Sequence, residues 1–163
     1  MPRQPRARHQ TPPAAQEKGF TLTELMIVVS LIGMLAALCI PAANRMRERG
    51  TNGRFVSDMR TAKFAFIQYS LEVGVYPEDT SPAQLPDGMR DYLRRFDWRH
   101  KTALGGYWDW DKGQFGYKAG VSVYHPTAPL RQLRDVDKLF DDGSLTTGDF
   151  LARPDGYISV IEN

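Results

Sequence analysis

Residues 18–41 read KGFTLTELMIVVSLIGMLAALCIP, and this stretch decides the fold of the N-terminal part of the chain. From Phe20 to Pro41 it is apolar apart from short polar side chains and one ionisable residue, Glu24. As a helix it measures about 33 Å, enough to cross a hydrocarbon core of roughly 30 Å. A carboxylate at mid-membrane costs roughly 2.5–3.5 kcal/mol, so Glu24 needs a partner or a place near the membrane edge.

The sequence GFTLTELMIV at 19–28 resembles the processing signature of type IV prepilins and of the pseudopilins of type II secretion. The resemblance implies that a prepilin peptidase cuts after Gly19 and methylates the new N-terminal residue, Phe20. It also implies that Glu24 is the assembly carboxylate, which pairs with the N-terminus of a neighbouring subunit. Pro41 stands where that family has a helix-kinking proline.

Three other interpretations of the stretch remain open. An ordinary secretory signal peptide has an apolar region of about 7–15 residues, shorter than this one. A lipoprotein signal would use Cys39, but Leu38 precedes the cysteine where that processing needs a small residue. The third interpretation is a plain single-pass anchor with no assembly role, and the acidic residue Glu24 within the apolar stretch argues against it.

Charge alone does not orient the segment, because arginines flank it on both sides. The resemblance places the leader in the bacterial cytoplasm. The chain is then a single-pass inner-membrane protein whose C-terminal domain is periplasmic or extracytoplasmic, and it later joins a filament.

Composition bounds what the rest of the chain can be. The net charge is +2, but acidic residues slightly outnumber basic ones after residue 53, so the C-terminal domain has no overall charge footprint for nucleic acid. The single cysteine, Cys39, excludes an intrachain disulfide. That removes the disulfide-closed C-terminal loop common in major adhesive pilins and favours a pseudopilin. About 110 residues outside the membrane suffice for one small domain.

A helical face begins after the apolar stretch, where apolar residues recur in alternating steps of four and three. Its members are Phe55, Met59, Ala62, Phe66, Tyr69 and Val73. We expect the helix to be weakened at Gly50–Gly53 and to end at Gly74. The predicted organisation is a basic, disordered leader (1–19), a transmembrane and assembly helix (20–41), its continuation (42–74) and a small α+β extracytoplasmic domain (75–163).

The remaining pattern predicts short elements around one antiparallel sheet. A loop covers 77–88, and a short amphipathic helix covers Met89–Phe96. The predicted strands are 107–111, 114–118, 121–124 and 157–161, and a further helix covers 130–140. The fold class is therefore α+β, with a long N-terminal helix packed on a small antiparallel β-sheet domain, as in pilins.

Alternation puts Trp108 and Trp110 on one face of their strand. We expect these indoles to pack on the helical face; a stacking platform for a sugar is the alternative. The only basic cluster of the C-terminal domain is Arg90, Arg94, Arg95, Arg99, His100 and Lys101. Interleaved Asp91 and Asp97 favour a solvated surface over a phosphate or lipid-headgroup site.

A turn-rich acidic loop contains Asp141, Asp142 and Asp149. Calcium needs six to eight oxygens, which clustered aspartates can supply, and the resemblance extends to pseudopilins that bind calcium in comparable loops. The spacing matches no EF-hand, and residues 109–113 are an equally loose candidate. Hydrogen-bonded turns are the default, so we expect no cofactor, with calcium as the open possibility.

Nothing in the sequence predicts an enzyme. His9, His100 and His125 are far apart, no His or Cys pair has metal-ligand spacing, and no nucleophile motif is present. We therefore expect a filament subunit. Its partners are other pilin or pseudopilin subunits, the prepilin peptidase and methyltransferase, and inner-membrane lipid. The alternative is a membrane-anchored binding module, and the choice between secretion, adhesion, motility and DNA uptake stays open.

Overall fold

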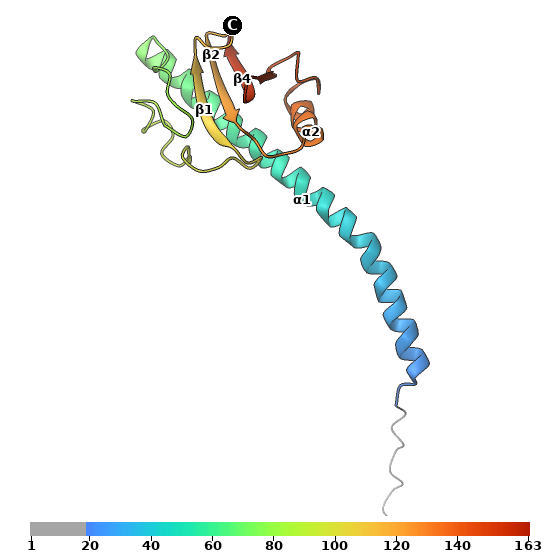
Figure 1. The fold of residues 1–163 in the computed structure, drawn as a ribbon. Helices are drawn as coiled ribbons and strands as arrows, with labels where there is room; N and C mark the ends of the chain where they lie inside the picture. The colour runs from blue at the N-terminus through green and yellow to red at the C-terminus, as the bar shows by residue number, and fades with distance from the viewer. Residues whose placement is uncertain (1–18) are drawn as a thin grey trace, which may run out of the picture. The chain divides into compact units, whose positions relative to one another are not determined.

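A computed structural model describes residues 19–163 of the chain. Its elements, shown in Figure 1, are α1 (Leu22–Val73), β1 (Tyr107–Lys112), β2 (Ala119–Tyr124), α2 (Leu130–Phe140), β3 (Phe150–Arg153) and β4 (Gly156–Glu162). The chain forms two compact units, one ending at Pro41 and one covering Ala42–Asn163. The predicted α+β class is confirmed. The leader lies outside the described residues except for Gly19.

The unit that ends at Pro41 contributes the apolar part of α1. By length and composition, α1 is the one helix in the described part of the chain able to cross a membrane, and its most apolar window is not buried against the protein. Side chains such as Leu25, Ile32 and Leu38 are more than half exposed. Exposing so much apolar surface to water is unfavourable, so an apolar environment around this helix would stabilise it.

The second unit is built on a four-stranded antiparallel sheet of order β1-β2-β4-β3. In the β1–β2 pair, Tyr107 lies opposite Tyr124 and Lys112 opposite Ala119. The predicted strand at 114–118 is therefore wrong, and these residues belong to the loop between β1 and β2. Gly113, Phe115 and Gly116 all have left-handed φ angles, which a strand cannot accommodate.

Two further expectations need correction. The helix expected at 89–96 is absent: residues 89–95 form consecutive turns, with a single i to i−4 hydrogen bond, from the Leu93 N–H to the Met89 carbonyl. Because Met89 and Leu93 are buried in the core, tertiary packing overrides the local helical spacing. The sequence analysis missed β3, a four-residue edge strand too short to show alternation.

The predicted helical face of α1 forms one side of the core. Phe55, Met59, Ala62 and Phe66 are fully buried, whereas Val73 is 52% exposed and lies outside the core. The expected weakening at Gly50–Gly53 is absent, since α1 runs through these residues without interruption. The helix ends as predicted, with Gly74 at a φ of +86°.

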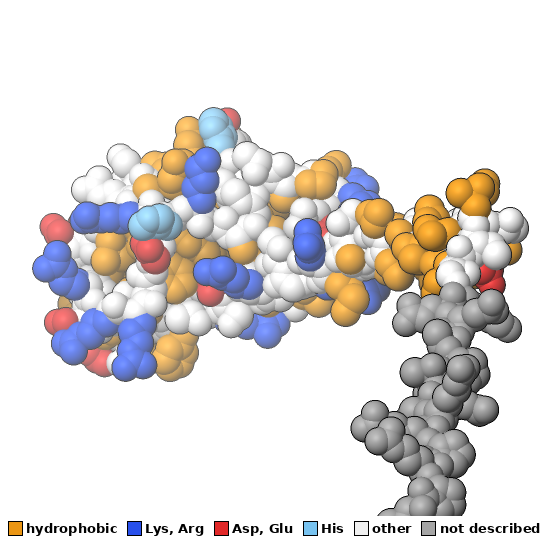
Figure 2. All heavy atoms as spheres, turned by 90° about the horizontal axis from the view of Figure 1, so that it is seen from below, with side chains coloured by type: hydrophobic (Ala, Val, Ile, Leu, Met, Phe, Trp, Pro, Cys, Tyr) orange, Lys and Arg blue, Asp and Glu red, His pale blue; other side chains and the backbone are white. Residues whose placement is uncertain are grey.

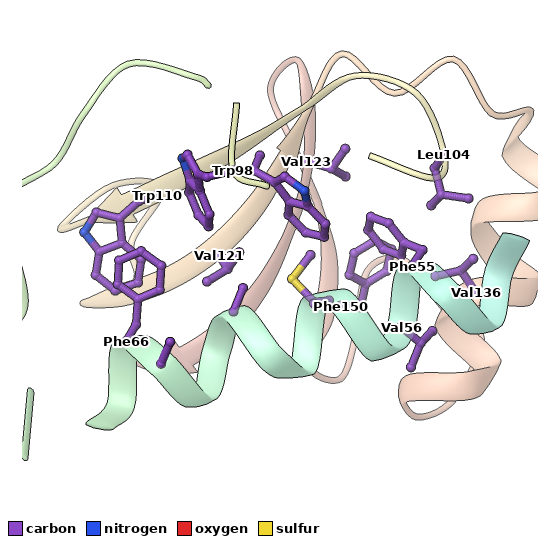
Figure 3. Packing of buried hydrophobic residues seen from close by; sticks show 14 of the residues in the cluster. Phe55, Val56, Phe66, Trp98, Leu104, Trp110, Val121, Val123, Val136 and Phe150 are labelled. Atoms are coloured by element: carbon purple, nitrogen blue, oxygen red, sulfur yellow. The ribbon is translucent and has the colours of Figure 1, made fainter. Parts of the chain in front are cut away.

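The indoles of β1 form the other side of the core, as expected. The ring of Trp110 stacks on that of Phe66 with centroids 3.9 Å apart, and Trp108 stacks on Phe55 at 5.5 Å. Figure 3 shows Phe55 and Phe66 pointing from α1 toward the sheet, with Trp110 against Phe66. The Trp110 Nε1–H donates to the Pro77 carbonyl at 3.1 Å, so its polar atom is satisfied. Neither indole is available as a ligand platform.

Candidate assembly site and acidic loop

The first turn of α1 is held by a reciprocal capping box between Thr21 and Glu24. The Glu24 N–H donates to the Thr21 hydroxyl oxygen at 3.2 Å, and Glu24 Oε2 accepts from the Thr21 N–H and hydroxyl, each at 2.8 Å. Since α1 begins at Leu22, Thr21 is the N-cap and Glu24 the N3 residue of this motif. Sequence reasoning missed this role, although the spacing Thr-x-x-Glu was visible.

The residues expected at the processing site precede the helix. Gly19 and Phe20 lie before α1, Phe20 is 83% exposed, and a Cβ added at Gly19 would meet no atom within 4 Å. Nothing in the described chain therefore requires glycine at position 19 for folding. Pro41 lies inside α1, which continues past it to Val73.

In the acidic loop, the structure brings Asp141 and Asp142 together with Asp137 of α2. One carboxylate oxygen from each lies within 4.8 Å of the others. Asp137 was not anticipated, because its place within an amphipathic helix gives no sign of a ligand. Asp149 contributes its backbone N–H, which donates to Asp141, and its carboxylate is not a member of this group.

The three carboxylates differ in their hydrogen bonds. Asp141 Oδ1 accepts from the Asp142 N–H at 2.6 Å, and Asp142 accepts from the Ser144 N–H at 2.7 Å and the Thr147 hydroxyl at 2.6 Å. These bonds are the hydrogen-bonded turns expected for such a sequence. Asp137 is fully buried, and neither of its oxygens has a hydrogen-bond partner.

A buried carboxylate without a donor is costly, and the cost can be relieved in two ways. Burial raises the pKa of Asp137 to about 7, and the nearby charges of Asp141 and Asp142 add to the effect, which favours a neutral carboxyl group. Alternatively, a divalent cation can bind between the three aspartates. The orphaned oxygens of Asp137 beside two other carboxylates fit a calcium ion, which takes oxygen ligands only.

The other loose calcium candidate, residues 109–113, is explained by an internal ion pair. Arg153 of β3 donates to Asp109 at 2.6 Å, and its Nε lies 3.6 Å from Asp111, with all three side chains buried. Burial raises the pKa of Asp109 to about 6, and the charge of Asp111 adds to the effect. The guanidinium of Arg153 thus occupies the place where a metal cation was considered.

The basic cluster is a solvated surface. Arg94 pairs with Asp91 at 2.9 Å and His100 with Asp97 at 2.5 Å, and all four side chains are exposed. Figure 2 shows Lys and Arg side chains interspersed with Asp and Glu on one face of this unit. This pattern agrees with the solvated interpretation.

Comparison with known proteins decides the nature of the N-terminal segment. Residues 15–40 match the family model described as the prokaryotic N-terminal methylation motif. The chain carries a prepilin-type methylation motif. The resemblance stated from residues 19–28 is thereby confirmed.

The curated relatives have names from two kinds of system, type IV pili or fimbriae and type II secretion. The type IV major pilin protein PilE of Neisseria gonorrhoeae is 37% identical over 67 residues, covering 41% of this chain and 40% of its own. Fimbrial protein EcpC of Eikenella corrodens is 39% identical over 67 residues, covering 41% and 44%. The type II secretion system core protein G of Klebsiella pneumoniae is 34% identical over 62 residues, covering 38% and 40%.

The chain spans less than half the length of the curated relatives it matches first. No solved structure matches this chain. The named relatives are pilins, a fimbrial protein and a secretion-system core protein, which are structural proteins and not enzymes. This agrees with the expectation that the chain has no catalytic role.

Proposed function

We propose that this chain is a structural subunit of a type IV pilus-like or type II secretion pseudopilus filament. The observation that carries the proposal is the methylation motif placed at the start of an apolar helix that no other part of the described chain covers. The helix can stay out of water in lipid and, after assembly, among the helices of other subunits. Both environments bury apolar surface, so the transfer between them costs little hydrophobic free energy.

The proposed sequence of events begins with cleavage between Gly19 and Phe20 by prepilin peptidase, followed by methylation of Phe20. The subunit then rests in the inner membrane with its N-terminus in the cytoplasm. On assembly, Glu24 pairs with the N-terminal amine of a neighbouring subunit. A carboxylate that enters a dry helix bundle must find a charged partner or take up a proton, which makes Glu24 a determinant of register.

Replacement of Gly19 tests this processing step. We expect Gly19→Leu and Gly19→Glu to block cleavage and leave the 19-residue leader attached, visible as a larger intact mass. Gly33→Leu is the matched control, because a Cβ at Gly33 also meets nothing within 4 Å and that residue lies far along the chain from the bond that is cut. Wild-type protein that begins at Met1, or a Gly19 variant cleaved like wild type, would contradict the proposal.

The alternative function is a membrane-anchored binding module, and the structure does not support the ligand surface proposed for it. It depended on exposed indoles at Trp108 and Trp110, and both are buried against α1.

We further propose that Asp137, Asp141 and Asp142 hold a calcium ion that stabilises the turn after α2. The unpartnered oxygens of buried Asp137 support this proposal. We expect saturating calcium to raise the melting temperature of the detergent-solubilised full-length chain by about 5 °C or more. Magnesium should do so less, because it demands a tighter octahedral geometry.

Asp137→Asn distinguishes calcium binding from a neutral carboxyl group. If calcium binds, the variant loses the calcium-dependent shift, while Asp135→Asn, on the same helix but exposed and paired with Arg131 and Lys138, retains it. If Asp137 is instead neutral, the amide replaces it without loss and wild type shows no calcium response. That second result would refute the calcium proposal.

A further inference from the structure

Beyond the apolar stretch, α1 carries a group of arginines. Arg45, Arg47 and Arg49 are exposed, and within the part of the chain that the structure describes none of them forms an ion pair. The acid among them, Glu48, is already engaged by Arg131, whose terminal nitrogen lies 2.6 Å from its carboxylate. Residues 19–163 therefore leave these three charges without an ion-pair partner.

The arginines surround the helix rather than lining one face of it. At about 100° per residue, Arg49 lies roughly 40° from Arg45, whereas Arg47 lies roughly 200° from it. All three fall within about 6 Å along the helix axis. We call them the arginine ring. A layer of lipid headgroups encloses a membrane-inserted helix on every side, so charges spread around the helix suit such a layer before the subunit joins a filament.

The position of the arginine ring along the chain also fits a headgroup layer. Arg45 follows Ile40, the last apolar residue before Pro41, by five residues, or about 7.5 Å of helix. Headgroup regions extend roughly 5–8 Å beyond the hydrocarbon core on each side. Arginine stems can bend back toward such a layer, which brings Arg47 and Arg49 within reach of the same phosphates.

We propose that the arginine ring binds the phosphates of anionic phospholipids while the subunit rests in the membrane. This inference rests on the proposed membrane-inserted state and adds a ligand class to it. Cleavage after Gly19 removes Arg3, Arg6, Arg8 and Lys18, so the ring is the main basic flank of the mature span. Its phosphate contacts fix the depth of the span, and they must break when the subunit leaves the bilayer for a filament.

The experiment uses the mature chain that begins at Phe20, because the basic residues of the leader would bind the same lipids. It compares the binding of phosphatidylglycerol and phosphatidylcholine with identical acyl chains to this chain in detergent, by native mass spectrometry. At about five-fold per arginine near an anionic surface, wild type should prefer phosphatidylglycerol at least about five-fold. The triple variant Arg45→Gln, Arg47→Gln, Arg49→Gln should lose this preference. The charge-matched control, Arg90→Gln, Arg95→Gln, Arg99→Gln, should keep it, because those exposed arginines lie in the domain far along the chain from the span.

Equal binding of the two lipids by wild type would overturn the inference, as would an equal loss in the control variant. A ring variant that keeps the lipid preference but no longer joins filaments would show that the arginines contact a neighbouring subunit instead, which also overturns it. Because the measurement uses the unassembled chain, its failure leaves the proposed filament function standing. A failure of processing at Gly19 would refute that function, and the lipid preference of the chain that begins at Phe20 would still be measured independently.

Discussion

Replacing Trp110 with alanine will unfold the C-terminal unit or bring it close to unfolding. Trp110 is fully buried and stacks on Phe66 at 3.9 Å. Truncating such a side chain typically costs about 3–5 kcal/mol, against a total stability of about 5–15 kcal/mol for a whole domain. The variant also leaves the Pro77 carbonyl without its donor. Urea denaturation followed by tryptophan fluorescence and near-ultraviolet circular dichroism will measure the loss.

Phe64→Ala is the control for Trp110→Ala. Phe64 is also a large aromatic residue, but it lies on the outer side of α1 and is 67% exposed. We expect its removal to change the free energy of unfolding by less than about 0.5 kcal/mol. A Trp110→Ala variant with the wild-type denaturation midpoint would contradict the core assignment, and loss of ligand binding with the fold intact would revive the binding-module alternative.

The features that could be predicted from the sequence depend on short, regular spacing. The helical face from Phe55 to Phe66 and the paired indoles Trp108 and Trp110 follow from periods of 3.6 and 2, so both were found. The motif around Gly19 and Glu24 is contiguous in sequence, which allowed the candidate residues of the N-terminal site to be named without any knowledge of the fold.

The features that could not be predicted depend on contacts between distant residues. Arg153 pairs with Asp109, 44 positions earlier, and sequence spacing gives no indication of such a pair. In the sequence, Asp137 looks like an ordinary polar residue of a surface helix. In the structure it is buried on α2 beside Asp141. The turns at 89–95 were also not predictable from sequence. Their conformation is set by the burial of Met89 and Leu93 in the core and not by the local apolar spacing.

Glu24→Gln will be inserted and cleaved normally but incorporated into filaments at least about ten-fold less than wild type. Glu24 has two separable roles: its side chain caps α1, and in the proposed assembly its charge pairs with the amine of a neighbouring subunit. Glutamine also serves as the N3 residue of a capping box, so this variant keeps the hydrogen bonds to Thr21 while it loses the charge. Breaking a buried charge pair by removing one partner costs about 3–5 kcal/mol, which is more than a ten-fold effect requires.

Thr21→Val is the reciprocal variant, because it removes the N-cap hydroxyl and leaves the Glu24 carboxylate in place. Loss of an N-cap costs about 0.5–2 kcal/mol of helix stability, and a freed carboxylate remains available to the amine of a neighbouring subunit. We therefore expect Thr21→Val to be incorporated nearly as well as wild type when both are expressed with the other filament subunits. Glu24→Ala and Glu24→Val, which lose both the charge and the cap, should do no better than Glu24→Gln. If Glu24→Gln is incorporated normally and Thr21→Val is not, the role of Glu24 in this chain is helix capping, and its charge has no part in assembly.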